Sequence, residues 1–271
     1  MSSNLTSRTI DDFGDQWTRY TGNEGFYGSA ELLADVFGPV MELDALKGKR
    51  VAEIGSGTGR IVEMLLAAGA AHVTALEPSQ AMRVLRENTA HHADRITYLE
   101  CRGEELPSEP AQDVVMSIGV LHHIPDPAPV VEAAYNALKP GGRMLVWLYG
   151  WEGNALYLSL VLPLRAVSTR LPHGVLSVLC HALNAVLSVY IAVARRIPVP
   201  LHRYMTQVIG RFSRQKRYLV IYDQLNPAYA KYYRQTEARR LLEQAGFEDI
   251  VLYHRHGYSW TVAGRRPLRS S

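Results

Sequence analysis

A glycine-rich turn between a strand and a helix constrains the fold of this chain more than any other feature. Residues 50–54, RVAEI, predict a buried strand, and GSGTG at 55–59 leads directly into an amphipathic stretch that begins at Arg60. Glycines allow a ligand to approach bare backbone at such a turn, beside the positive end of the helix dipole. The dinucleotide fingerprint needs a glycine three positions after its second one, where this chain has Arg60. The spacing therefore argues against a nicotinamide-dependent dehydrogenase.

Strand-like and helix-like segments alternate along most of the chain. The apolar periodicity predicts strands at 50–54, 72–76, 96–100, 113–119, 142–149, 248–255 and 257–263, and helices at 30–40, 59–69, 79–91, 127–138 and from Glu237 to Gly246. Strands that alternate with helices of about ten or more residues form parallel sheets with helices on both faces. The predicted fold class is α/β: a seven-stranded, mostly parallel sheet, covered on both faces, with a helical insert after the fifth strand.

The charged residues divide the chain unequally. Residues 1–152 hold 12 Lys and Arg against 21 Asp and Glu, whereas residues 153–222 hold nine basic residues and no acidic one. This asymmetry predicts an acidic body that carries a basic insert. We therefore divide the chain into N-terminal cap helices at 1–48, a main domain at 49–152 and 223–271, and the helical insert at 153–222.

Composition and cysteine usage indicate an ordinary globular chain. Apolar residues make up 47% and charged residues 20% of the sequence, which argues against a disordered or fibrous protein. Cys101 and Cys180 lack the spacing of a zinc or redox site. Residues 1–30 show no basic segment followed by an apolar one, so no export signal is predicted. We expect a reduced, cytoplasmic protein.

Two acidic residues stand at the carboxyl ends of the first two predicted strands. Glu77 follows the strand at 72–76, and an acid there can accept hydrogen bonds from both hydroxyls of a ribose. Glu53 lies just before the glycine turn, and we expect its side chain to face the same ligand crevice at the strand ends as Glu77. A buried acid costs free energy unless it has a partner, so we expect a cationic or amino group of the ligand beside Glu53.

Five motifs in sequence order carry a resemblance to a known family. VAEIGSGTGR, ALEPS, GEELP, MSIGVLHHIPDP and ALKPGGRMLVWLYG resemble the motif series of class I S-adenosylmethionine-dependent methyltransferases. The chain is most similar to the small-molecule (type 11) subgroup of ubiquinone and menaquinone biosynthesis. The resemblance covers residues 50–150 closely and 236–263 more loosely, and it does not cover the insert. It implies a Rossmann-like fold and S-adenosyl-L-methionine as the cofactor.

The resemblance also implies roles for single residues. If the family's roles apply to the matching positions, Glu53 lies near the methionyl amine and Glu77 binds the ribose. The methionine moiety is then lined by Gly55, Ser56 and Gly57. Arg102 departs from the family, because it stands where an aspartate usually accepts from the adenine amino group, and arginine has donors only. We therefore assign the adenine to Gly103 and Glu104, flanked by Ser79 and Met82, and add Ser117 as a further cofactor-binding residue.

Two adjacent histidines follow the fourth predicted strand, where open α/β sheets bind their ligands. With an ordinary pKa of about 6.5, His122 or His123 could take a proton from the acceptor as the methyl group transfers. The alternative is that one imidazole only packs against the sheet or caps the next helix. Adjacent side chains diverge and no further ligand accompanies them, so no metal is predicted.

The insert contains an uncharged segment of 24 residues at 171–194. Its length would allow a membrane span, but Pro172 and Gly174 interrupt its start. A narrow polar line runs along the predicted helix, formed by Ser177, His181, Asn184 and Ser188. This pattern is typical of a helix that faces a cavity or packs against partners.

Two interpretations of the insert follow. In the first, it is a lid over an apolar acceptor chamber, and the acceptor-binding residues are Tyr20, Tyr27, His181 and Asn184. In the second, it is a packing helix or a homodimer interface. The segment 195–217 adds seven basic residues and no acid, which fits a peripheral contact with anionic lipid, an anionic acceptor group or a solvated face. No recognition motif accompanies the charge, so nucleic acid is not an expected partner.

Taken with the resemblance, these features predict an S-adenosylmethionine-dependent methyltransferase of a biosynthetic pathway. Its acceptor is expected to be a small, largely apolar molecule, and O-methylation is favoured. The alternatives are C- or N-methylation of a lipid, quinone or polyketide-like acceptor, and a non-catalytic protein that binds the cofactor and serves assembly. The expected location is cytoplasmic, with membrane association as an option that the basic insert leaves open.

Overall fold

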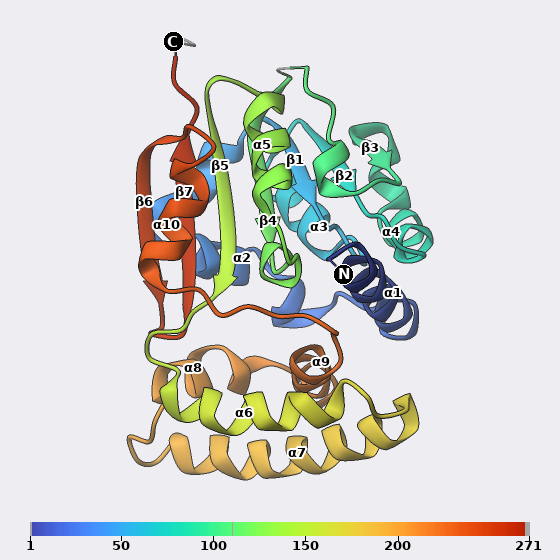
Figure 1. Ribbon diagram of the computed structural model, residues 1–271, viewed down its shortest axis with the longest axis vertical. Helices are drawn as coiled ribbons and strands as arrows, with labels where there is room; N and C mark the ends of the chain where they lie inside the picture. The colour runs from blue at the N-terminus through green and yellow to red at the C-terminus, as the bar shows by residue number, and fades with distance from the viewer. Residues whose placement is uncertain (1, 110, 269–271) are drawn as a thin grey trace.

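The computed structural model describes residues 2–109 and 111–268, and these residues build a seven-stranded sheet covered by helices (Figure 1). The strands are β1 Arg50–Ile54, β2 His72–Leu76, β3 Ile96–Leu99, β4 Gln112–Ile118, β5 Leu138–Tyr149, β6 Glu248–Arg255 and β7 Ser259–Arg265. Their order is β3-β2-β1-β4-β5-β7-β6. Neighbouring strands from β1 to β5 are parallel, whereas β7 runs antiparallel to β5 and β6. The predicted fold class is confirmed.

Helices cover both faces of the sheet because successive residues of its strands point to opposite apolar layers. Val51 of β1 belongs to one layer, and its neighbour Ala52 belongs to the other. The first layer contains side chains of α2 (Ala30–Phe37), α3 (Arg60–Ala67) and α4 (Ala81–Asn88). The second layer contains side chains of α5 (Ala128–Ala137) and α10 (Gln235–Glu243).

The predicted elements agree with the observed ones to within a few residues. β1, β2 and β6 have the predicted bounds, and the helix predicted at 59–69 is α3. The largest difference is at β5, which begins at Leu138 instead of residue 142. Leu138 already pairs with Gln112 of β4, ahead of an irregularity in the register of the two strands.

The N-terminal segment forms a long helix, α1 (Ser2–Arg19), which lies beside α4 (Figure 1). Gln80, at the start of α4, donates its side-chain amide to Asp15 of α1 at 2.7 Å. Ile10, Phe13 and Trp17 recur at steps of three and four, so they share one face of the helix. That face lines the central cavity described below.

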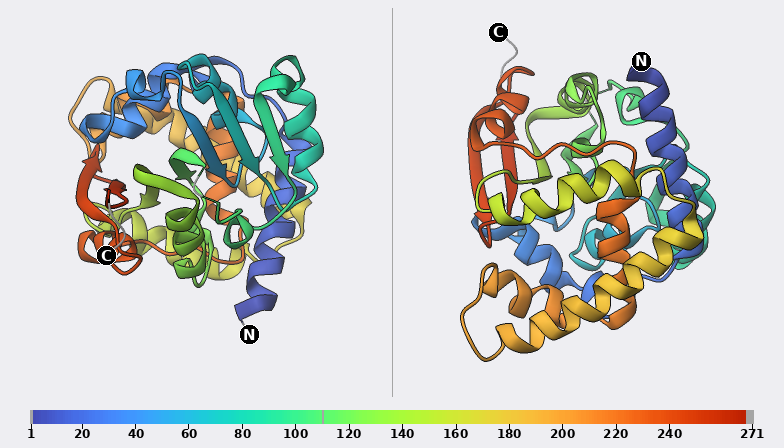
Figure 2. Two further views of the ribbon diagram at one scale, coloured as in Figure 1. Left: turned by 90° about the horizontal axis from the view of Figure 1, so that it is seen from above. Right: turned by 60° about the horizontal axis from the view of Figure 1, so that its bottom comes forward.

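The insert follows β5, as predicted, and lies beyond the carboxyl ends of the parallel strands (Figures 1 and 2). It forms α6 (Ala155–Ser168), α7 (His173–Ala194), α8 (His202–Gln207) and α9 (Arg214–Leu225). Apolar side chains of α6, α7 and α9 share a cluster that contains Leu158, Cys180 and Tyr218. The buried guanidinium of Arg165 in α6 donates Nη2 to the carbonyl of Pro227 at 2.8 Å. This bond joins the insert to the chain that returns to the sheet.

A buried ion cluster connects α2 to the hairpin of β6 and β7. Arg255 is 2% exposed, and its Nε donates to Asp35 Oδ2 at 2.9 Å, while His256 Nε2 lies 2.7 Å from Asp35 Oδ1. Partial burial raises the pKa of Asp35. The hydrogen bonds and charges of His256 and Arg255 lower it by more, so the net pKa of Asp35 is lowered. Asp35 therefore compensates a cation that is almost completely buried.

Asp35→Asn should lower the free energy of unfolding by about 3 kcal/mol, because it leaves the Arg255 guanidinium buried without a compensating charge. Urea unfolding measures this loss. Because the folded-state pKa of Asp35 is depressed, its contribution is complete above the unfolded-state pKa and declines as pH falls through the folded-state pKa. The matched control is Asp249→Asn, which removes an exposed partner of Arg265 and should cost less than about 1 kcal/mol. Equal losses in the two variants would contradict this account.

Candidate functional site

A cavity of 740 Å³ lies between the carboxyl ends of the strands, α1 and the insert. The glycine turn and Glu77 lie at its boundary on the sheet side. The insert contributes mainly apolar side chains, among them Leu160, Leu164, Leu183, Leu187, Tyr190, Leu201, Tyr204 and Leu219. A polar crevice at the sheet and an apolar chamber under the insert therefore form one continuous space.

The glycine turn has the backbone conformation that glycine favours. Gly55, Gly57 and Gly59 have φ angles of 79°, 51° and 84°, in the region that side chains disfavour. The backbone amides of Gly55 and Ser56 donate to the carbonyl of Leu76 at 2.9 and 2.8 Å, which joins the turn to the end of β2. A Cβ at Gly57 would lie 3.4 Å from the indole nitrogen of Trp17, so this side of the turn faces α1.

Glu77 connects the turn to the start of α4. Its Oε2 accepts from the Gly57 amide at 2.8 Å, and its Oε1 accepts from the amide and hydroxyl of Ser79 at 3.0 and 2.5 Å. Burial raises the pKa of Glu77, and the hydrogen bonds from Ser79 and Gly57 oppose that rise. A carboxylate has about four lone-pair sites, and three are used here, so Glu77 retains capacity for a ligand hydroxyl at the cavity.

Glu53 is a buried acid without a partner for one of its oxygens. It is 1% exposed, it lines the cavity, and its Oε2 has no hydrogen-bond partner in the described part of the chain. Burial, with a smaller contribution from the charge of Glu77, raises the pKa of Glu53 to about 7. An unpaired buried carboxylate is costly, so this position favours a cationic ligand group.

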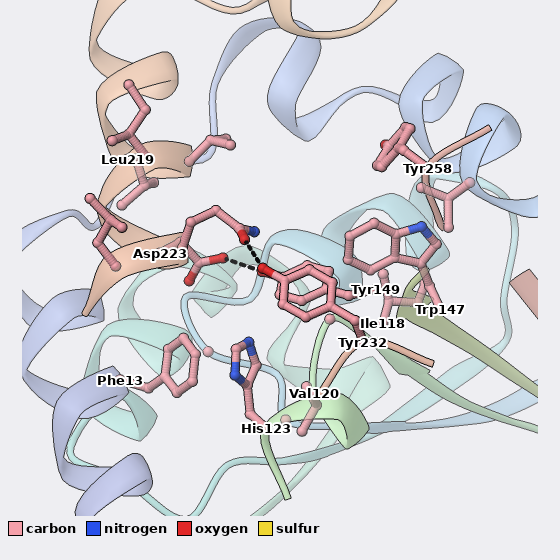
Figure 3. Close-up of a pocket in the computed structure, with 18 of the residues that line it drawn as sticks. Phe13, Ile118, Val120, His123, Trp147, Tyr149, Leu219, Asp223, Tyr232 and Tyr258 are labelled. Carbon is pink, nitrogen blue, oxygen red and sulfur yellow. Dashed lines mark hydrogen bonds between the residues drawn. The ribbon is translucent and has the colours of Figure 1, made fainter. Parts of the chain in front are cut away.

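The two histidines occupy different environments, and only one of them lines the cavity. His122 is fully buried and is not part of the cavity wall, and its ring stacks on Tyr149 with the centroids 3.7 Å apart. The packing alternative therefore describes His122. His123 does line the cavity, between Phe13 and Tyr149 (Figure 3).

The geometry of His123 defines which nitrogen can act. Burial lowers the pKa of His123 to about 3, so the ring is neutral at ordinary pH. Its Nδ1 lies 2.8 Å from the carbonyl of Tyr229, and because a carbonyl only accepts, we assign the proton to Nδ1. Nε2 then keeps a free lone pair and has no partner among the described residues. His123 can accept a hydrogen bond at the cavity, but it is a weak base.

An acid that the sequence analysis did not single out faces the same space. Asp223 of α9 lines the cavity, and its Oδ2 accepts from the Tyr149 hydroxyl at 3.3 Å (Figure 3). Its Oδ1 accepts from the side-chain amide of Gln16 at 3.1 Å. Burial raises the pKa of Asp223, and the two hydrogen bonds oppose that rise. One sequence signal was available, because Asp223 is the first acid after seventy residues without one.

Of the four predicted acceptor-binding residues, Tyr27 lines the cavity and the other three do not. Tyr20 donates its hydroxyl to that of Tyr218 at 3.0 Å. Asn184 donates to the carbonyl of Arg214 at 2.8 Å, and the ring of His181 lies 4.5 Å from that of Tyr218. Asn184 and His181 of the polar line therefore contact α9. The assignment of Tyr20, His181 and Asn184 to acceptor binding stays a prediction.

The residues predicted to bind the adenine and the rest of the cofactor also differ in whether they line the cavity. Gly103 and Glu104 line the cavity, as does Arg102, whose Nη2 donates to Ser7 of α1 at 3.3 Å. Ser79, Met82 and Ser117 are buried, but none of them is part of the cavity wall. Ser79 instead holds Glu77, Met82 packs in the apolar layer, and Ser117 lies within β4. The assignment of these three residues to the cofactor stays a prediction.

Comparison with known proteins covers the part of the chain that forms the sheet side of this site. Residues 52–146 match the family model of the methyltransferase domain. The ubiquinone biosynthesis O-methyltransferase of Aromatoleum aromaticum is 35% identical over 132 residues, which cover 48% of this chain and 56% of that protein. The enzyme of the same name from Marinobacter nauticus is 36% identical over 107 residues, covering 38% and 44%. The chain therefore spans about half the length of the curated relatives it matches.

Solved structures agree on the fold. A Burkholderia thailandensis 1,6-didemethyltoxoflavin-N1-methyltransferase superimposes with a TM-score of 0.58 at 14% identity, covering 98% of this chain and 91% of that one. At this identity the likeness concerns the fold alone. The family model and the sheet topology agree that residues 52–146 match a methyltransferase domain within a fold shared with solved methyltransferases.

Proposed function

We propose that this protein transfers a methyl group from S-adenosylmethionine to a hydroxyl of a small, largely apolar acceptor. The observation that carries this proposal is the shared cavity, in which the glycine turn and two buried acids adjoin an apolar chamber. One ligand can occupy the crevice and a second can occupy the chamber without a wall between them. Such an arrangement supports group transfer between two bound molecules.

The residues at the sheet fit the cofactor. Glu53 offers an unpaired carboxylate oxygen to the methionyl ammonium, and Glu77 offers its remaining lone pair to the ribose. The turn at Gly55 and Gly57 allows close approach to backbone, and Gly103 and Glu104 border the adjoining wall for the adenine. When bound, the cofactor supplies a sulfonium methyl group that is already activated for transfer. The protein then needs to supply alignment and exclusion of water.

The chamber offers two polar groups to the acceptor. Asp223, whose pKa is raised by burial, is a stronger base than an ordinary carboxylate, and Gln16 and Tyr149 hold it in place. His123 Nε2 can accept a hydrogen bond from the acceptor without adding charge. We assign proton removal to Asp223 and orientation of the acceptor hydroxyl to His123. Two acceptors of hydrogen bonds favour an O–H or N–H group over a carbon nucleophile.

The direct test of the function is release of S-adenosylhomocysteine. The protein is incubated with S-adenosylmethionine and a panel of apolar phenols and alcohols, matched methyl ethers that have no free hydroxyl, and apolar amine and carbon acceptors. Turnover that is confined to the hydroxylated members of the panel supports O-methylation. Cofactor binding without turnover across hydroxyl, amine and carbon acceptors would favour the alternative of a non-catalytic cofactor-binding protein.

Glu77→Ala should weaken binding of S-adenosylhomocysteine by about 1 to 3 kcal/mol, because it removes the acceptor for a ribose hydroxyl. Calorimetric titration measures the change. Since Glu77 also holds the Gly57 amide, Glu77→Gln serves as the matched variant: its carbonyl can keep that hydrogen bond, so a smaller loss is expected. Unchanged affinity in the alanine variant would refute the ribose assignment.

Asp223→Asn should lower turnover about a hundredfold with little effect on cofactor affinity, because general bases contribute factors of that order. In the native protein the rate should fall as pH decreases through the raised pKa of Asp223, since the acid form cannot take a proton. The asparagine variant should lose this acidic limb. His123→Asn should weaken acceptor binding but keep the limb. If His123→Asn loses the acidic limb and Asp223→Asn keeps it, the general base is His123.

A further inference from the structure

The outer face of α7 is apolar along its whole length. Val175, Val178, Val186, Val189 and Val193 are 38 to 70% exposed and follow one another at steps of three, eight, three and four, which places them on one face of the helix. The helix spans 22 residues, its most apolar window has a mean hydropathy of 1.9, and only 22% of that window is buried. By length and composition alone it could cross a membrane. A core helix would be mostly buried, so this face requires another explanation.

α6 extends the apolar surface and connects it to the cavity. Both helices lie at the end of the molecule beyond the carboxyl ends of the strands (Figures 1 and 2). Leu156 and Leu160 of α6 and Val186 of α7 are 62, 69 and 67% exposed, and all three also line the cavity. The chamber therefore reaches the outer surface between α6 and α7, and apolar side chains border it there.

Basic residues flank this surface. Arg170 precedes α7, Arg195 and Arg196 end it, and Arg203 lies in α8; all four are exposed. The insert from 153 to 222 contains no acidic residue. An apolar helix face with arginines at its ends matches the surface of an anionic membrane, where acyl chains lie beneath negatively charged headgroups.

We propose that the outer face of α6 and α7 is a peripheral docking surface for an anionic phospholipid bilayer. A second copy of the chain fits less well, because two cationic inserts would repel each other. A full span fits less well, because the opposite side of α7 is committed to α9: Asn184 is buried there and donates to Arg214. Docking does not depend on the proposed activity. If that activity holds, an apolar acceptor could enter the chamber directly from the lipid.

Vesicle flotation of the full chain tests the proposal. Wild-type protein should float with vesicles of phosphatidylcholine and phosphatidylglycerol, bind less to pure phosphatidylcholine, and be released from the anionic vesicles by high salt. Val178→Glu combined with Val189→Glu should lower the partition coefficient about tenfold or more, because it places two charges in the apolar face. Arg196→Gln combined with Arg203→Gln should lower it by roughly tenfold on anionic vesicles only.

Matched controls separate docking from general effects. Val251→Glu makes the same change at an exposed position of β6, and Arg50→Gln with Arg240→Gln removes two charges from other exposed sites; neither should alter flotation. Thermal melting of each variant shows that it is folded. Unchanged flotation of the valine variant would overturn the proposal. A protein that does not float and forms a dimer by light scattering would also overturn it, in favour of a second copy. Membrane-bound protein that resists extraction by alkaline carbonate would overturn it in favour of a membrane span.

Discussion

The hydrogen bond from the Gly57 amide to the Glu77 carboxylate is the constraint on which the site depends. It joins the turn after β1 to the residue after β2, and Ser79 holds the other oxygen of the same carboxylate. Its three glycines, Gly55, Gly57 and Gly59, have positive φ angles, which side chains disfavour, and they leave room for a ligand beside the turn. These bonds shape the crevice in which Glu53 is buried, and Glu53 Oε2 has no hydrogen-bond partner among the described residues.

The insert adds what the sheet alone lacks. It covers the crevice with apolar side chains, and its last helix, α9, continues past residue 222 and places the Asp223 carboxylate in the chamber. Gln16 of α1 and Tyr149 of β5 both hold that carboxylate, so three distant parts of the chain meet at one group. The two ligand positions therefore depend on different parts of the sequence. The methyltransferase motifs shape one of them, and the insert shapes the other.

The sequence was informative where local chemistry determines structure. Apolar periodicity located β1, β2 and β6 at their observed bounds, and the glycine spacing identified the turn. It was less informative where side-chain direction depends on tertiary packing. His122 and His123 are neighbours in sequence, yet only His123 reaches the cavity, and the polar line of α7 faces α9 because its partners lie there. Asp223 and Gln16, which are 207 residues apart, could not be paired from spacing alone.

The central claim is that Glu53 receives the cationic end of the cofactor, and proton exchange on binding tests it most directly. Because burial raises the pKa of Glu53 to about 7, this acid is largely protonated below that pH, and a ligand ammonium should ionise it. Calorimetry in buffers of different ionisation enthalpy should therefore show that S-adenosylhomocysteine releases a proton on binding, and that Glu53→Gln abolishes the release. Binding without proton release, or equal binding of NAD, would contradict this account.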